Sequence, residues 1–134
     1  MWALNVKSTF FMIQESKELL TASGKGSAVH VVSSVTGQNP QRMIGVYAMT
    51  KAALENMVKF LAEEMRPDKV RVTGIAPGLI RTNFADYLLK NPKLDQKVVG
   101  EAHQIGSVVA TICSEDGSFM NGETYQVHGG YPKI

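Results

Sequence analysis

The run Ala28-Val29-His30-Val31-Val32 decides the fold of this chain. It is short, rich in β-branched side chains, and bounded by Gly26 and Ser33. Apolar residues lie on both sides of the backbone along this run, which is typical of a strand covered on both faces, as in a parallel sheet. The sequence therefore predicts a buried parallel strand over residues 28–32.

Similar strand patterns recur further along the chain, over residues 70–76 and 123–127. Apolar residues at helical spacing predict four helices around them, over residues 2–20, 46–65, 84–89 and 101–112. Strands that alternate with helices in this way lie parallel and are joined by right-handed crossovers. We expect an α/β fold with about three parallel strands and flanking helices.

Composition narrows the class of protein. The chain has 134 residues, 44% hydrophobic and 19% charged, which is typical of one globular domain. The 14 Lys and Arg residues nearly balance 12 Asp and Glu residues, so no nucleic-acid partner is expected. No apolar stretch reaches the roughly 18 residues that cross a membrane. The single Cys113 excludes an internal disulfide, and with 3 His residues it makes no zinc pattern, so no metal site is expected.

Two residues on the second long helix could carry chemistry. Tyr47 and Lys51 are four residues apart, so both project from one face of a helix. An ammonium group near a phenol favours the phenolate and lowers the pKa of the tyrosine. Such a tyrosine can exchange a proton with a substrate oxygen near neutral pH. The alternative is a solvated Tyr–Lys pair on an exposed helix face.

The ends of the first two strands strengthen the catalytic interpretation. Ser34 follows the first strand, and ligands of open α/β sheets bind outside the carboxyl ends of the strands. Its hydroxyl could donate a hydrogen bond to a carbonyl oxygen there. The second strand ends in the segment 76–82, where Pro77 and Gly78 allow a sharp turn that faces a ligand. A simple strand-to-loop turn is the alternative for this segment.

Taken together, five segments resemble the classical short-chain dehydrogenase/reductase family. They are Asn5-Val6-Lys7, Val32-Ser33-Ser34, Tyr47-Ala48-Met49-Thr50-Lys51, Pro77-Gly78-Leu79-Ile80-Arg81-Thr82 and Asn121-Gly122-Glu123-Thr124. Residues 76–82, 113–116 and 122–124 are most similar to the carbonyl (retinal, dicarbonyl) reductase branch. The resemblance implies an NAD(P)-dependent oxidoreductase that reduces carbonyl compounds or oxidises alcohols.

The resemblance also implies roles for individual residues. Tyr47 would be the general acid for carbonyl reduction and the general base for alcohol oxidation. Lys51 would lower the pKa of that tyrosine and hold the hydroxyls of the nicotinamide ribose. Ser34 would bond the substrate oxygen, and the main chain of Asn5 would hold a proton-relay water.

A cofactor, NADP or NAD, is implied by the same resemblance, and the cofactor itself would carry the hydride chemistry. Pro77 and Gly78 would lie along the nicotinamide. The backbone of Ile80 would bond the carboxamide, and Thr82 would add its hydroxyl.

The nucleotide-binding part of the family pattern is absent from this sequence. Gly24-x-Gly26 precedes a strand instead of following one, so it cannot place a pyrophosphate at a helix N-terminus. We therefore expect residues 1–134 to be a single partial domain, the C-terminal half of a Rossmann-like, doubly wound parallel sheet. The substrate-binding segment, residues 83–99, is also shorter than that of related reductases.

Such a half domain leaves apolar surface uncovered. We expect it to form a homo-oligomer through the helices near residues 2–20 and 46–65. The expected substrate is a small carbonyl compound or alcohol. The alternative function is a catalytically inactive remnant that pairs with full-length relatives through the same helices. The expected compartment is the cytoplasm, with the peroxisome as the alternative because of the tail Pro132-Lys133-Ile134.

Overall fold

The computed structural model describes residues 1–23 and 26–130. Gly24 of the Gly24-x-Gly26 segment and the tail Pro132-Lys133-Ile134 lie outside the described residues. The helices and strands, in chain order, are α1 (Ser8–Ala22), β1 (Ser27–Val32), α2 (Gly45–Met65), β2 (Val70–Pro77), β3 (Ile80–Arg81), α3 (Asp86–Leu89), β4 (Gly100–Glu101), α4 (Ala102–Cys113) and β5 (Thr124–Val127). A π-helical turn, Ala3–Lys7, leads directly into α1.

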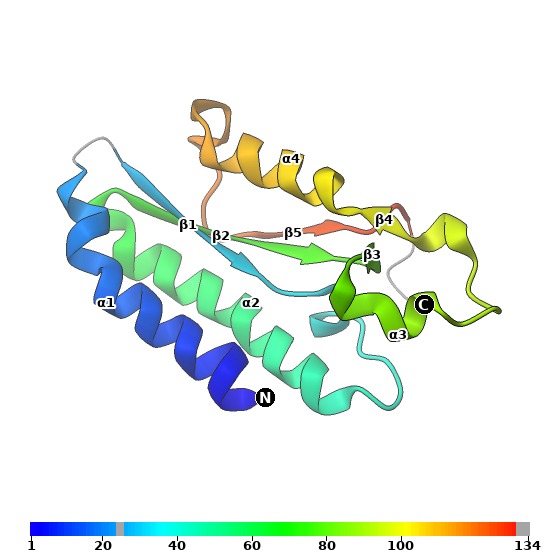
Figure 1. Ribbon diagram of the computed structural model, residues 1–134. Coiled ribbons are helices and arrows are strands. Elements are labelled where there is room, and N and C mark those ends of the chain that lie inside the picture. The colour runs from blue at the N-terminus through cyan, green and yellow to red at the C-terminus, as the bar shows by residue number, and fades with distance from the viewer. Residues whose placement is uncertain (24–25, 131–134) are drawn as a thin grey trace.

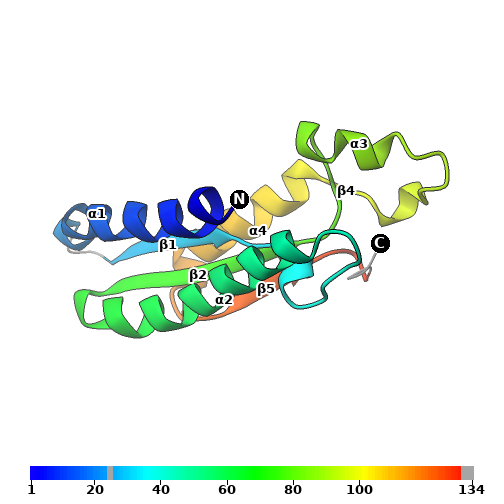
Figure 2. The same cartoon turned by 90° about the horizontal axis from the view of Figure 1, so that it is seen from below.

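The central sheet is parallel, as the sequence predicts, with the strand order β1-β2-β5. Helices α1 and α2 cover one face of this sheet and α4 lies on the opposite face (Figure 1). The view from below shows α1 and α2 side by side in front of the strands (Figure 2). The predicted α/β fold with three parallel strands and flanking helices is therefore confirmed.

A second, smaller sheet was not predicted from the sequence. Strands β3 and β4 pair in parallel, with Ile80 opposite Gly100 and Arg81 opposite Glu101. Each strand has only two residues, so neither produces a readable hydrophobic pattern. This pairing ties the segment that leaves β2 to the start of α4.

The main core lies between α2 and the sheet. Helix α2 buries Leu54, Met57, Val58, Leu61, Ala62 and Met65 along one face, at the spacing of an amphipathic helix. These side chains form one cluster with Ile13 of α1, Val31 of β1, and Val70 and Val72 of β2. Helix α2 ends at Met65, where Arg66-Pro67-Asp68 forms a 3-10 turn, as the proline predicts.

The other face of β2 is held to α4 by Arg71. Side chains alternate along a strand, so Arg71 points away from its buried neighbours Val70 and Val72. Its Nη1 donates to three carbonyl oxygens at the end of α4 and just beyond it, those of Ile112 (3.0 Å), Gly117 (2.8 Å) and Met120 (3.1 Å). The guanidinium group therefore fixes the C-terminal end of α4 against the sheet.

The outer surfaces of α2, of α1 and of the π-helical turn before α1 carry many exposed apolar side chains. Leu4 is 74% exposed, Met12 68%, Val46 65% and Met49 64%. Across residues 1–23 and 26–130, β1 and β5 each pair only with β2, so neither edge of this sheet has a further strand beside it. Within the same residues, no helix is long and apolar enough to cross a membrane.

Candidate active site

Ser34 lies at the carboxyl end of the sheet, directly after β1. The backbone N–H of Ser33 donates to the carbonyl of Ile75, at 2.7 Å, which places Ser34 beside the end of β2. Ser34 caps the 3-10 turn Val35–Gly37 by accepting hydrogen bonds from Thr36, at 3.3 Å from the backbone nitrogen and 3.1 Å from the hydroxyl. The capping bonds fix the Ser34 side chain at the rim of the sheet.

Tyr47 and Lys51 occupy the first two turns of α2, which begin close to that rim. The ammonium nitrogen of Lys51 lies 5.5 Å from the centre of the Tyr47 ring. It also donates a hydrogen bond to the carbonyl of Val32, the last residue of β1, at 3.0 Å. Both side chains are half-buried, and the side chain of Ser34 lies close enough to Tyr47 to lower the pKa of the phenol. The structure therefore brings Ser34, Tyr47 and Lys51 together.

Burial shifts the pKa values of Tyr47 and Lys51. It raises the pKa of Tyr47 above its ordinary value, and the hydrogen bond with Ser34 opposes that rise. Burial also lowers the pKa of Lys51. The net pKa of Tyr47 therefore lies above its ordinary value, and the lowering expected from Lys51 stays a prediction. The physical reason is that desolvation of the phenol dominates, while the ammonium lies over the ring and bonds Val32.

Asn5 joins the same region from the π-helical turn before α1. Its side-chain amide donates to the hydroxyl of Thr50 at 3.0 Å, and that hydroxyl donates to the carbonyl of Tyr47 at 2.7 Å. The carbonyl of Asn5 accepts a hydrogen bond from the hydroxyl of Thr9 at 2.8 Å. Asn5 thus contacts the first turns of α2 through Thr50, which is fully buried.

The turn after β2 places the remaining expected residues. Gly78 donates from its backbone to the carbonyl of Val127 at 2.9 Å, and a Cβ at this position would lie 2.8 Å from the Cβ of His128. Only glycine allows the ends of β2 and β5 to approach so closely. Pro77 ends β2, Ile80 begins β3, and the hydroxyl of Thr82 donates to the carbonyl of Ile80 at 3.3 Å.

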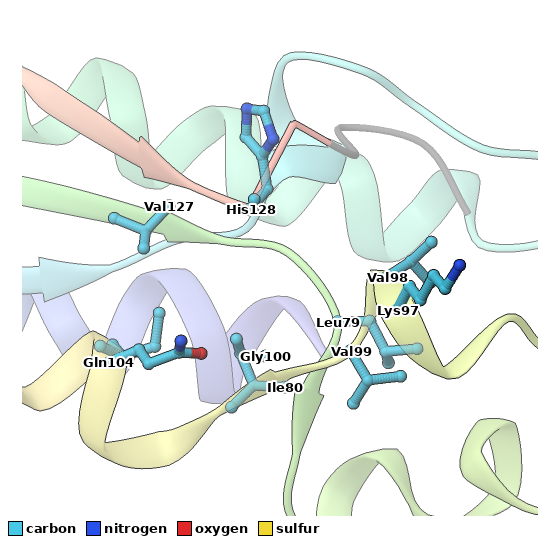
Figure 3. Close-up of a pocket in the computed structure, with 11 residues that line it drawn as sticks. Leu79, Ile80, Lys97, Val98, Val99, Gly100, Gln104, Val127 and His128 are labelled. Atoms are coloured by element: carbon cyan, nitrogen blue, oxygen red, sulfur yellow. The ribbon is translucent and has the colours of Figure 1, made fainter.

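A cleft of about 300 Å³ opens beside this turn (Figure 3). Its lining is mainly apolar and includes Leu79, Ile80, Val98, Val99 and Val127. In the close-up, the imidazole of His128 extends away from Gly100 and Ile80. Ile80 is one of the residues that line this mainly apolar space.

A second cleft, of about 400 Å³, lies between the loop before α2 and the segment that contains α3. It is lined by Gln41, Leu88, Asn91, Lys93, Leu94, Asp95 and Val98. The side-chain nitrogen of Gln41 is buried there and has no hydrogen-bond partner among the described residues. The ring of Phe84, in the 3-10 turn just before α3, lies 6.3 Å from that of Tyr47.

Sequence reasoning missed Gln41 and Phe84. The signal for Phe84 was a lone aromatic residue in a polar segment, and Gln41 gave none beyond its place in the loop near Pro40. Within the described ranges, no group of three or more His, Cys, Asp and Glu side chains could hold a metal ion.

Comparisons with known proteins bear directly on this geometry. A family model described as enoyl-(acyl carrier protein) reductase matches residues 1–132. The chain is 41% identical over 139 residues to tropinone reductase-like 3 of Erythroxylum coca, covering 98% of this chain and 52% of that protein. The chain belongs to the short-chain dehydrogenase/reductase family. It is also 35% identical over 135 residues to dehydrogenase/reductase SDR family member 4 of Bos taurus, covering 95% of this chain and 48% of that protein.

Solved structures agree with this membership of the short-chain dehydrogenase/reductase family. A short-chain type dehydrogenase/reductase from Mycobacterium ulcerans superposes with a TM-score of 0.90 at 27% identity, covering 98% of this chain and 50% of that one. A 7α-hydroxysteroid dehydrogenase in complex with NADH and 7-oxo glycochenodeoxycholic acid gives 0.89 at 28% identity, covering 96% and 53%. The chain spans about half the length of the relatives it matches.

Proposed function

We propose that this chain supplies the catalytic half of an NAD(P)-dependent oxidoreductase that interconverts a small carbonyl compound and its alcohol. The observation that carries the proposal is the convergence of Ser34, Tyr47 and Lys51 at the rim of a parallel sheet. Membership of the short-chain dehydrogenase/reductase family supports it. The substrate class follows the similarity of residues 76–82 to carbonyl reductases.

Ser34 and Tyr47 would act on the substrate oxygen. The hydroxyl of Ser34 donates a hydrogen bond to the carbonyl oxygen and holds it next to Tyr47. In reduction, the phenol of Tyr47 gives its proton to that oxygen as the alcohol forms; in oxidation, the phenolate takes the proton back. A phenol whose pKa is raised by burial is fully protonated at neutral pH, which suits it to the role of acid.

Lys51 and Asn5 would support Tyr47. A nicotinamide ribose beside Lys51 would accept hydrogen bonds from the ammonium group, which the carbonyl of Val32 already holds in place. Asn5 would stabilise the start of α2 through Thr50, and its main chain would hold the proton-relay water.

The residues after β2 fit the nicotinamide end of the cofactor. Gly78 permits the close approach of backbone to backbone, and Ile80 lies in the wall of the apolar cleft. Pro77, Gly78, Ile80 and Thr82 would hold the ring and its carboxamide. When bound, the nicotinamide gives or takes the hydride. Both NAD and NADP are compatible with this site.

A second candidate function is an inactive partner of full-length relatives. The observation that favours it is that the chain spans about half the length of the relatives it matches. The exposed apolar faces of α1 and α2 would bind a second copy in the first function and a full-length relative in the second. We propose the cytoplasm as the compartment, with the peroxisome as the alternative.

Titration of the intrinsic fluorescence with NADH and NADPH distinguishes the two functions. Trp2 is the single tryptophan and lies three residues before Asn5. Saturable quenching at micromolar cofactor, reduced by Lys51→Met, supports the oxidoreductase. A flat titration for both cofactors, together with tight binding to a full-length relative, supports the inactive partner.

A further inference from the structure

Glu55 carries a buried carboxyl group one helical turn after Lys51 on α2, and the proposed function gives it no role. Glu55, on α2, is only 9% exposed and is the one buried charged side chain in the described part of the chain. Among the same residues it forms no ion pair. Burying a carboxylate without a cation is unfavourable, and a leucine of similar volume would suit the core better. The presence of Glu55 therefore calls for a reason other than stability.

The hydrogen bonds of Glu55 lead directly to the end of β1. The hydroxyl of Ser33, itself 4% exposed, lies 3.0 Å from a carboxylate oxygen of Glu55 and 3.0 Å from the carbonyl of Lys51. It donates its single proton to these two acceptors. Ser33 immediately precedes Ser34, so this contact fixes the backbone that carries the proposed substrate-binding hydroxyl.

The 3-10 turn that follows Ser34, Val35–Gly37, packs against the carboxylate of Glu55. A Cβ on Gly37 would lie 2.7 Å from the Glu55 oxygen and 3.0 Å from the backbone nitrogen of Ala52. The turn Val35–Gly37 therefore sits directly on α2 at Glu55. Ser34 is held on both sides, through Ser33 before it and through Gly37 after it.

The helix that provides this support also carries the other two catalytic candidates. Lys51 lies one turn before Glu55 and Tyr47 lies two turns before it. A shift of the β1 end along α2 would change the separation between Ser34 and Tyr47, and with it the lowering effect of Ser34 on the pKa of Tyr47.

We propose that Glu55 is a positioning residue that, through Ser33, sets the place of the Ser34 hydroxyl relative to Tyr47. The proposal rests on the proposed function for its catalytic meaning. The contact between Glu55 and Ser33 lies within this chain, so its effect on the place of Ser34 can be measured without enzymatic turnover.

The test compares matched substitutions in the full chain. Glu55→Gln keeps an oxygen that accepts from Ser33, while Glu55→Leu removes it at similar volume. Ser33→Ala removes the donor and adds no atoms. If Glu55→Leu fails to fold, Ser33→Ala still tests whether the hydrogen bond between Ser33 and Glu55 positions Ser34. Leu61→Ala is the control, because it weakens the same helix from a buried position without touching Ser33.

The readout is the pKa of Tyr47, followed by NMR of ring-labelled tyrosine and assigned with Tyr47→Phe. Because the Ser34 hydrogen bond lowers that pKa, we expect Glu55→Leu to give a higher pKa than Glu55→Gln. We likewise expect Ser33→Ala to give a higher pKa than the wild type, and Leu61→Ala to match the wild type. Equal values for Glu55→Leu and Glu55→Gln, or a rise in Leu61→Ala as large as that in Ser33→Ala, would overturn the proposal.

Steady-state kinetics give a second readout. Glu55→Leu should lower kcat by about tenfold relative to Glu55→Gln, the effect of one misplaced hydrogen bond, with little change in KM. Absence of turnover in the wild type counts against the proposed function, while the pKa of Tyr47 still decides the role of Glu55.

Discussion

Replacing Arg71 with leucine should loosen α4 from the sheet, and the structure sets the size of the effect. One guanidinium nitrogen, Nη1, carries two hydrogens and serves the three carbonyls of Ile112, Gly117 and Met120 at 2.8–3.1 Å. These contacts amount to two full hydrogen bonds from a charged donor, each contributing about 1.5–3 kcal/mol. Water can replace part of the loss because the site is half-buried. We expect Arg71→Leu to lower the free energy of unfolding by about 3 kcal/mol.

The assay is urea unfolding followed by far-UV circular dichroism at one fixed protein concentration. Arg71→Lys is the matched control, since an ammonium can still serve some of the carbonyls from a shorter reach and should lose roughly 1 kcal/mol. Hydrogen exchange should show the loss of protection concentrated at the end of α4. A loss below about 1 kcal/mol in Arg71→Leu, or protection lost equally across α2, would refute the reasoning.

Lys51, Gly78 and Phe11 offer three further tests. Burial lowers the pKa of Lys51 in the folded state below its value in the unfolded chain. The free energy of unfolding of the wild type should therefore rise as the pH increases from the folded to the unfolded pKa of Lys51. Urea unfolding of Lys51→Met should lack that rise. Gly78→Ala should lower stability by about 1–3 kcal/mol in a thermal melt, because its Cβ would meet His128, whereas Gly45→Ala, whose Cβ meets nothing within 4 Å, should be neutral or stabilising. Phe11→Glu, on the exposed face of α1, should shift sedimentation towards monomer, and an unchanged profile would count against assembly through that face.

The layout of strands and helices was predictable because burial imposes strong patterns. The helix that carries Leu54, Val58 and Leu61 shows the period that the core requires. The run at 28–32 forms the predicted parallel strand, but its predicted burial on both faces is wrong: only Val31 is buried and Val32 is 53% exposed, because β1 is an edge strand. The approach of Ser34 to Tyr47 was also predictable, since a strand end and a helix start meet at the same rim of an α/β sheet.

Other features depend on contacts that leave no local pattern. The pairing of Ile80 with Gly100 joins residues far apart in the chain, and a two-residue strand has no readable period. The raised pKa of Tyr47 reflects how far the fold buries the phenol, which the spacing to Lys51 cannot reveal. Glu55 gives no signal in the sequence, and its burial and its contact with Ser33 become visible only in the fold.

The most direct test of the central claim is hydride transfer from NADH or NADPH to small ketones by the purified chain, compared between the wild type and Tyr47→Phe. We expect saturable turnover in the wild type and a loss of about 100-fold or more in the variant, the usual contribution of a general acid. Equal rates in the two proteins, or a wild type that binds the cofactor yet transfers no hydride to any ketone, would contradict it.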